Sequence, residues 1–205
     1  MVRAEQVGAT TEPAEQAQTY VKHYASPEAM WREWQALKAC RGVGVQRVHA
    51  VDTDRQALML EFDSSAMPLS EFDEADLALF VAVLPALVSV IQHCHARGWV
   101  HGDIKPSNIV YVPTTQTIRL IDFGASYRIG TSREALSEWQ VTPMFATGQQ
   151  VRGEGLVQTG DDWYALINII DQVMPFAHDR LLLQALQSVR DGVAADIKQS
   201  ERTTK

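Results

Sequence analysis

The sequence predicts an α+β fold in which a long apolar helix is followed by a short hairpin of strands. Residues 77–95 form a largely apolar run, which is typical of a mostly buried helix. Its longest uncharged stretch is too short to span a bilayer comfortably. Alternating apolar residues at 109–112 and 118–121, separated by Pro113-Thr114-Thr115, predict two paired strands.

The ends of these elements carry signals of their own. Acidic residues within 73–76 favour the start of the long helix, and Gly98 is expected to end it. Further along, residues 178–195 place apolar side chains on one face of an amphipathic helix of roughly four to five turns, ending near Gly192. We expect this helix to pack on residues 166–174, because it would otherwise expose its apolar stripe. The alternative is that the stripe docks a protein partner.

Between the long helix and the hairpin lies a polar segment whose residue types suit phosphate transfer. It is His-Gly-Asp-Ile-Lys-Pro-Ser-Asn at residues 101–108, and Asp-Phe-Gly follows at 122–124. Phosphate transfer needs a carboxylate facing the attacking hydroxyl, an ammonium for the transferred phosphate, and oxygen ligands for Mg²⁺. In chain order the candidates are Asp103 and Lys105 for catalysis, and Asn108 and Asp122 for the metal.

These two segments and their spacing resemble the catalytic loop and the D-F-G of protein kinases. The likeness can be followed from about residue 18 to about residue 175. It implies a bilobal, kinase-like fold in a single domain (1–205), with a reduced N-lobe at about 1–62, a hinge at about 62–70 and a truncated helical C-lobe at about 71–205. It also implies ATP and Mg²⁺ as cofactors and a protein substrate as partner.

The resemblance places two further side chains at the nucleotide. Lys22, at the end of an expected strand, is similar to the kinase Lys that holds the α- and β-phosphates. Glu33, on the next expected helix, is similar to the Glu that pairs with that Lys. Glu28 competes for this role, but the E-x-x-x-L spacing to Leu37 favours Glu33.

The rest of the N-lobe is expected in the same order. Residues 45–51 and 56–62 resemble two strands that lead to the hinge. Trp31, Trp34 and Leu37 share one helical face, and we expect them to form core rather than a nucleotide site.

Three residues match positions that support the catalytic loop in the family. His101 is expected to hold the loop rather than to shuttle protons. Thr142 lies in a segment similar to the end of a kinase activation loop and is expected to brace the catalytic side chains. Asp162 is similar to the Asp that begins the central large-lobe helix and binds the loop backbone, and the W-x-A-L tail favours it over Asp161.

The chain departs from the family pattern in several places. No G-x-G-x-x-G precedes Lys22, so the phosphates lack the usual lid or Val7–Thr10 serves as a short substitute. Gly42-Val43-Gly44 follows the N-lobe helix and is expected as its exit turn rather than as a nucleotide loop. Gly102 stands where many kinases carry Arg. The lack of A-P-E is similar to casein kinase 1, and only roughly 30 residues follow the central helix.

Three functions are compatible with these residues. The leading hypothesis is an ATP- and Mg²⁺-dependent Ser/Thr protein kinase, because Lys two places after the catalytic Asp is typical of that class. The second is a small-molecule kinase similar to aminoglycoside phosphotransferases, a class that usually lacks Lys105 and the segment of Thr142. The third is a catalytically weak pseudokinase acting as a binding module, which the missing glycine lid motivates.

Composition bounds the setting of the protein. The net charge of −7 disfavours nucleic acids and anionic membranes as partners. The polar start of the chain predicts no signal peptide, and Cys40 and Cys94 are expected as buried thiols, so the expected location is cytoplasmic. The small size is alternatively similar to bacterial effector kinases that are secreted into a host cell, which would make the substrate a host protein.

Overall fold

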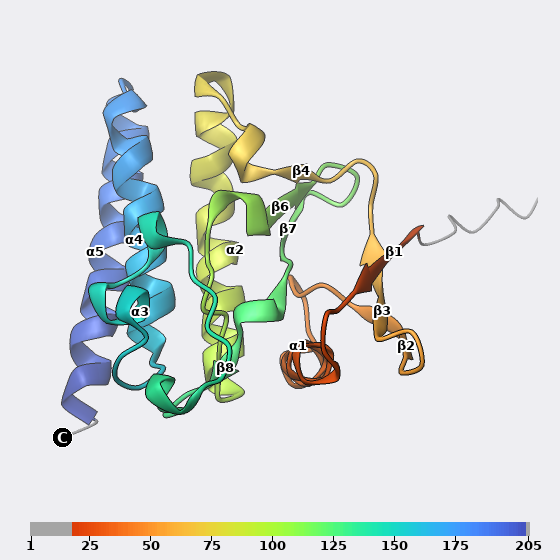
Figure 1. The fold of residues 1–205 in the computed structure, drawn as a ribbon. Coiled ribbons are helices and arrows are strands. Elements are labelled where there is room, and N and C mark those ends of the chain that lie inside the picture. The colour runs from red at the N-terminus through yellow and green to blue at the C-terminus, as the bar shows by residue number, and fades with distance from the viewer. Residues whose placement is uncertain (1–17, 204–205) are drawn as a thin grey trace, which may run out of the picture.

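The structure, a computed structural model, describes residues 18–203, so the expected lid substitute at Val7–Thr10 lies outside it. Two lobes are visible (Figure 1), which is the bilobal α+β arrangement that the sequence predicts. The smaller lobe joins one helix to a three-stranded sheet. The longer helices are α1 (Pro27–Ala39) in the smaller lobe and α2 (Leu77–Ala96), α4 (Thr159–Val173) and α5 (Arg180–Thr203) in the larger one.

The sheet of the smaller lobe is antiparallel. Its strands are β1 (Gln18–His23), β2 (Val48–Asp52) and β3 (Ala57–Phe62), in the spatial order β1-β3-β2. Lys22 lies opposite the buried Leu58 in the register of β1 and β3. This pairing fixes the point from which the Lys22 side chain leaves the sheet.

Helix α1 begins where the sequence supplies a cap. The Ser26 hydroxyl accepts a hydrogen bond from the backbone N–H of Ala29 at 3.2 Å. Pro27 occupies the first turn, where its missing N–H is not needed. These features satisfy the exposed start of the helix that later presents Glu33 to the site.

The tryptophan face of α1 is only partly core. Leu37 is buried and Trp34 is half-buried, but Trp31 is 37% exposed, so the expectation that it forms core was wrong. Trp31 packs edge-on against Trp34, with 5.1 Å between ring centroids. The ammonium of Lys38 lies 4.5 Å from the other ring of this pair, that of Trp34. These rings therefore form a partly exposed layer outside the core.

The segment Gly42-Val43-Gly44 forms the turn that follows α1, as predicted, and not a nucleotide loop. This turn also contacts the larger lobe. Gly44 has φ +80°, and a Cβ there would lie 2.2 Å from Val90 Cγ2, so both the backbone and the space require glycine. Leu120 of the larger lobe donates from its N–H to Gly44 O (2.8 Å) and accepts from Gln46 N–H (3.0 Å). Because this stretch pairs with the other lobe, β2 begins at Val48, three residues later than the strand expected from the sequence.

The chain crosses between the lobes at residues 63–66. Strand β4 (Met67–Pro68) already pairs with the hairpin of the larger lobe, which consists of β6 (Ile109–Val112) and β7 (Thr117–Leu120), in the order β4-β6-β7. The crossing is therefore shorter than the hinge expected at 62–70. The predicted hairpin is confirmed.

Helix α2 is the central helix of the larger lobe. Leu84, Leu87 and Ile91 are fully buried, and the chain leaves the helix at Gly98 with φ +79°, as predicted. Among residues 18–203 this is the one helix that is long and apolar enough to cross a membrane by length and composition. Here its buried face is the core against which the helices and hairpin of this lobe pack (Figure 1).

Short elements complete the larger lobe. Strand β5 (Trp99–Val100) pairs with β8 (Tyr127–Arg128), and helix α3 (Gly148–Arg152) follows. Cys94 of α2 and Cys40 at the end of α1 are both buried and free, as expected.

Helix α5 packs along α4, as predicted (Figure 1). Leu186 and Val193 are buried in the core, and the guanidinium of Arg190 pairs with the carboxylate of Asp171 at 2.5 and 3.1 Å. The expected end near Gly192 was wrong, because the helix continues for about three more turns. A glycine inside a helix costs only about 1 kcal/mol relative to alanine, which the favourable helix formers around it can offset.

Candidate active site

The catalytic loop is held from below by a buried carboxylate at the start of α4. Asp162 accepts hydrogen bonds from the backbone N–H groups of His101 and Gly102, each at 2.9 Å, and from His95 Nε2 at 2.8 Å. Burial acts to raise the pKa of Asp162, but the bond from His95 and these donors hold the pKa below its ordinary value. The structure thus brings Asp162, and not Asp161, to the loop. The hydrogen bond from His95 to Asp162 was not predicted from the sequence.

His101 connects the loop to the strand that precedes the D-F-G. Its Nε2 donates to Ile121 O at 3.0 Å, which leaves Nδ1 as the acceptor for the N–H of Asp103 at 3.3 Å. The ring lies against the buried Phe123, with 4.7 Å between ring centroids. Because both ring nitrogens are hydrogen-bonded within the protein, the position of His101 fits a structural role rather than proton transfer.

Asp103 and Lys105 lie in direct contact at the surface of the loop. Lys105 Nζ is 2.6 Å from Asp103 Oδ2 and 3.1 Å from Thr142 Oγ1. The amide nitrogen of Asn108 donates to Asp103 O (3.0 Å) and contacts Oδ2 (3.3 Å). Asp103 Oδ1 is buried and has no hydrogen-bond partner among the described residues. A buried acceptor of this kind is completed by an incoming donor, such as a hydroxyl.

The Lys22 ammonium lies between two carboxylates. Nζ is 3.0 and 2.8 Å from the two carboxylate oxygens of Glu33 and 2.6 Å from Asp122 Oδ1. Glu33 is fully buried whereas Glu28 is exposed, so the structure brings Glu33 to Lys22. Burial acts to lower the pKa of Lys22, but the two carboxylates outweigh it and raise the pKa. Lys22 therefore stays protonated between the two carboxylates.

Asp122 has a backbone that few non-glycine residues adopt. Its φ is +61°, and such a conformation costs on the order of 1–3 kcal/mol where the surroundings enforce it. Phe123 behind it is fully buried, and Arg32 of α1 donates to Gly124 O at 3.2 and 3.1 Å. Burial acts to raise the pKa of Asp122, but Lys22 holds the pKa below its ordinary value. The carboxylate is thus fixed in place and ionised.

A cleft of about 290 Å³ opens between the lobes above these groups. Its walls are Tyr20, Lys22, Gln46, Leu60, Phe62, Asn108, Ile121 and Asp122. Gln46 was missed in the sequence analysis: its amide nitrogen donates to Glu61 O at 3.0 Å on the chain that leads to the other lobe. Nothing in the sequence distinguishes this side chain from a solvated one.

The donor set of the cleft fits Mg²⁺. Asn108 uses its amide nitrogen on Asp103, which leaves the amide oxygen available as a ligand, and Asp122 supplies an ionised carboxylate. No group of three or more His, Cys, Asp or Glu side chains in residues 18–203 could hold a metal alone. Mg²⁺ is usually bound by one or two protein oxygens together with substrate phosphates and water, so a sparse set is what this metal requires.

The activation segment after the D-F-G is held by a buried cation. Arg133 is buried, and its guanidinium pairs with Asp161 and donates to Glu154 O at 3.0 Å. Its carbon CZ lies 5.3 Å from the Trp139 ring, whose nitrogen donates to Gln150 O at 2.5 Å. These residues tie the segment to α3 and α4. Sequence reasoning missed Arg133, since arginine in a polar segment is usually solvated.

Gly102 has a local reason to be glycine. Its φ is +81°, and a Cβ there would lie 2.4 Å from Ala125 O. The position that carries Arg in many kinases therefore has no room for any side chain in this loop.

We expect Gly102→Ala to lower the free energy of unfolding by about 1–3 kcal/mol through backbone strain, with a further loss from the clash. Gly98→Ala is a matched control, because Gly98 also has a positive φ but nothing within 4 Å of its Cβ. Urea unfolding of both variants isolates the clash as the difference between them. Equal losses in the two variants would contradict a tightly packed Gly102.

Comparisons with known proteins show the family of the chain. A family model described as "Protein kinase domain" matches residues 12–202. Over 109 residues the chain is 34% identical to serine/threonine-protein kinase PEPKR2 of Arabidopsis thaliana, covering 51% of this chain and 23% of that protein. Over 103 residues it is 30% identical to ribosomal protein S6 kinase alpha-3 of Homo sapiens, covering 47% and 14%. The chain thus spans less than a quarter of the length of these curated relatives.

Among solved structures, the chain is similar to the kinase PK-1 of Cydia pomonella granulovirus. The TM-score is 0.59, with 19% sequence identity, over 77% of this chain and 59% of that chain. At this identity the likeness concerns the fold alone.

Proposed function

Because this chain belongs to the protein kinase family, we propose that it transfers the terminal phosphate of ATP to a serine or threonine hydroxyl of a protein, with Mg²⁺ as cofactor. The supporting observation is Asp103 Oδ1, a buried acceptor that has no partner within residues 18–203 and belongs to the carboxylate held by Lys105. A substrate hydroxyl is the donor that would complete it.

Each side chain has a defined task in this reaction. Asp103 accepts the hydrogen of the attacking hydroxyl and orients the hydroxyl oxygen toward the phosphate. Lys105, beside it, neutralises charge on the transferred group, and Thr142 holds Lys105 in place. Lys22, anchored by Glu33, binds phosphate oxygens in the cleft. When bound, Mg²⁺ supplies further positive charge at the phosphates, with Asn108 and Asp122 as its protein ligands.

The contact of Lys105 with Thr142 favours a protein as the substrate. Thr142 lies in the segment after residue 127 that leads from the D-F-G to α3, and its hydroxyl is 3.1 Å from Lys105 Nζ. The segment therefore borders the place of the acceptor hydroxyl, where a polypeptide could lie along it. Small-molecule kinases of the aminoglycoside phosphotransferase type usually lack both residues.

Two measurements on the wild-type protein test the proposal. We expect ATP with Mg²⁺ at about 100 times the dissociation constant to add about 2.7 kcal/mol of stability, which raises the melting temperature by roughly 5–11 °C. We also expect transfer of labelled phosphate from ATP to Ser and Thr of a generic protein substrate such as casein. A thermal shift with transfer only to an aminoglycoside indicates a small-molecule kinase. A shift without any transfer indicates a binding module.

A further inference from the structure

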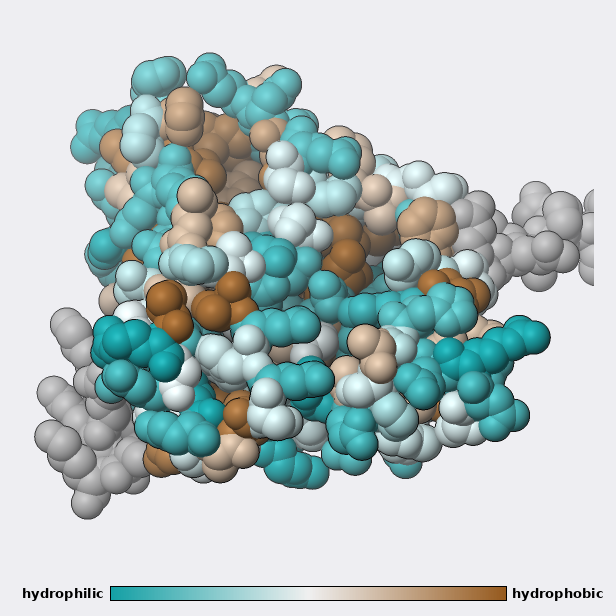
Figure 2. Space-filling view, in the orientation of Figure 1, coloured by the Kyte–Doolittle hydropathy of each residue, from teal (hydrophilic) through white to brown (hydrophobic). Residues whose placement is uncertain are grey.

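A second pocket lies on the larger lobe, between α4 and the segment that enters α2. It has a volume of about 310 Å³, within the size range of pockets that bind small ligands. Figure 2 shows a hollow surrounded by hydrophobic surface at the upper left, between the ends of α4 and α2. Eight of its lining residues are apolar: Leu69, Phe72, Leu77, Phe80, Pro106, Ile169, Val173 and Phe176.

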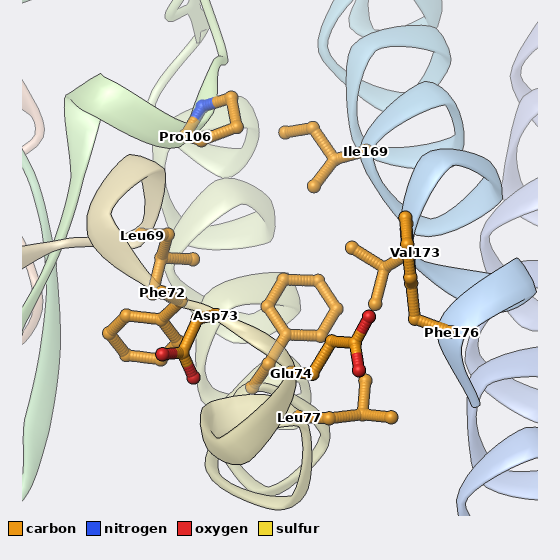
Figure 3. A pocket seen from close by; sticks show the side chains of 10 residues that line it. Leu69, Phe72, Asp73, Glu74, Leu77, Pro106, Ile169, Val173 and Phe176 are labelled. Carbon is orange, nitrogen blue, oxygen red and sulfur yellow. The ribbon is translucent and has the colours of Figure 1, made fainter. Parts of the chain in front are cut away.

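The pocket has an acidic side. Asp73 and Glu74, the two polar lining residues, stand next to each other where the chain enters α2 (Figure 3). Both are exposed, and in the described part of the chain neither has a Lys or Arg nitrogen within 4 Å of its carboxylate. Asp73 accepts from the N–H of Ala75 at 2.7 Å, whereas the Glu74 side chain makes no hydrogen bond or ion pair with the residues that the structure describes. The carboxylates therefore favour a ligand that carries a positive charge.

One residue of the wall opposite α4 comes from the catalytic loop. Pro106 lines the pocket and follows directly on Lys105 (Figure 3). Its Cα can lie at most about 11 Å from that of Asp103, because three consecutive Cα–Cα steps of about 3.8 Å join them. An extended peptide with its hydroxyl at Asp103 spans that distance in about three to four residues.

Apolar side chains of the pocket are exposed to solvent, although the core next to them is buried. Ile169 is almost fully buried at the base, but Phe176 is 50% exposed and Val173 is only half-buried. A bulky apolar side chain entering the pocket would remove this surface from water, at about 25 cal/mol per Å².

We propose that this pocket binds a bulky apolar side chain of the protein substrate, with a Lys or Arg next to it paired to Glu74 and Asp73. The inference rests on the proposed function, and it names the substrate class: Ser/Thr sites with an apolar-basic pair two to five residues from the acceptor. The short path from Asp103 to Pro106 favours a substrate segment over a free metabolite. These carboxylates, which have no Lys or Arg partner in the described part of the chain, favour a basic partner over a second, acidic copy of this chain.

The test uses fluorescent peptides with one Ser in an Ala background. A Phe-Arg pair is placed two to five residues before or after the Ser, and matched peptides carry Phe-Glu or Gly-Arg instead. Binding is measured by fluorescence anisotropy and phosphate transfer by initial rates, so the pocket is tested whether or not transfer occurs. Variants are Val173→Trp, which fills the pocket, and Glu74→Lys, which reverses its charge. Glu71→Lys is the matched control, since Glu71 is also exposed but does not line the pocket.

We expect one Phe-Arg register to bind at least about tenfold more tightly than its Gly-Arg counterpart, as the loss of a buried apolar group implies. Val173→Trp should remove that preference while leaving the KM for ATP and the melting temperature unchanged. Glu74→Lys should weaken Phe-Arg binding about threefold and favour Phe-Glu, whereas Glu71→Lys should not.

The two proposals fail in different ways. Wild-type protein that binds the Phe-Arg peptides through the pocket but transfers no phosphate overturns the proposed function and leaves the pocket assignment standing. Equal binding of all peptides, or an undiminished preference in Val173→Trp, overturns the pocket assignment even if transfer is observed.

Discussion

Asp103→Asn is expected to reduce phosphate transfer by at least about 10²–10⁴-fold, the usual contribution of a general base or its equivalent. The substitution preserves the shape of the side chain but removes the charge that accepts the hydrogen of the hydroxyl. Asp103 contacts Lys105 and Asn108 rather than the walls near Lys22, so ATP with Mg²⁺ should still raise the melting temperature. Initial rates and thermal shift measure the two effects separately.

Asp122→Asn is the companion variant, because it removes a carboxylate from the nucleotide cleft itself. It should lose the Mg²⁺-dependent part of the thermal shift as well as the transfer of phosphate. If both variants kept wild-type rates, the assignment of this loop as the catalytic centre would be wrong.

Removal of residues 178–205 is the second large effect, and it concerns stability. The deletion takes away Leu186 and Val193, each worth about 1.5–3 kcal/mol when fully buried. Together, at about 3–6 kcal/mol, they equal a large part of the unfolding free energy of a typical domain, about 5–15 kcal/mol. It also exposes the side of α4 that α5 covers. We expect aggregated protein or a melting temperature lower by many degrees, measured by circular dichroism and light scattering.

Point variants on α5 provide a matched test of the same contact. Leu186→Ala should lower the free energy of unfolding by about 2–5 kcal/mol, because it leaves a cavity in the core. Leu181→Ala changes the same residue type on the same helix, but Leu181 is 74% exposed, so the loss should stay within about 0.5 kcal/mol. A 178–205 deletion that remained soluble and melted normally would show that α5 serves to dock a partner instead.

Much of the site could be anticipated because its residues lie close together in the chain or at family spacings. The residues of the loop from His101 to Asn108 are contiguous in the chain, so their proximity could be predicted from the sequence. Asp122 follows after one hairpin. Lys22 and Glu33 were placed by order along the chain, which worked because a strand and a helix on one lobe leave few ways to meet.

What could not be anticipated depends on contacts between distant segments. Gln46 bonds across the sheet to Glu61, and Arg133 is buried only because Asp161, 28 residues later, is brought beside it. Trp31 follows the helical period of the core, but its layer of aromatic rings remains open to solvent. The length of α5 was underestimated, since one glycine was given more weight than the helix formers on either side.

The ion pair between Arg133 and Asp161 bears on how the segment after the D-F-G is held in place. A phosphate on an activation segment is a reversible charge, which one enzyme adds and another removes. The charge of Arg133 is permanent, because it belongs to an amino-acid side chain. Breaking a buried ion pair by removing one partner costs about 3–5 kcal/mol. The conformation of this segment is thus fixed when the chain folds. We therefore expect this segment to keep its position without an added phosphate.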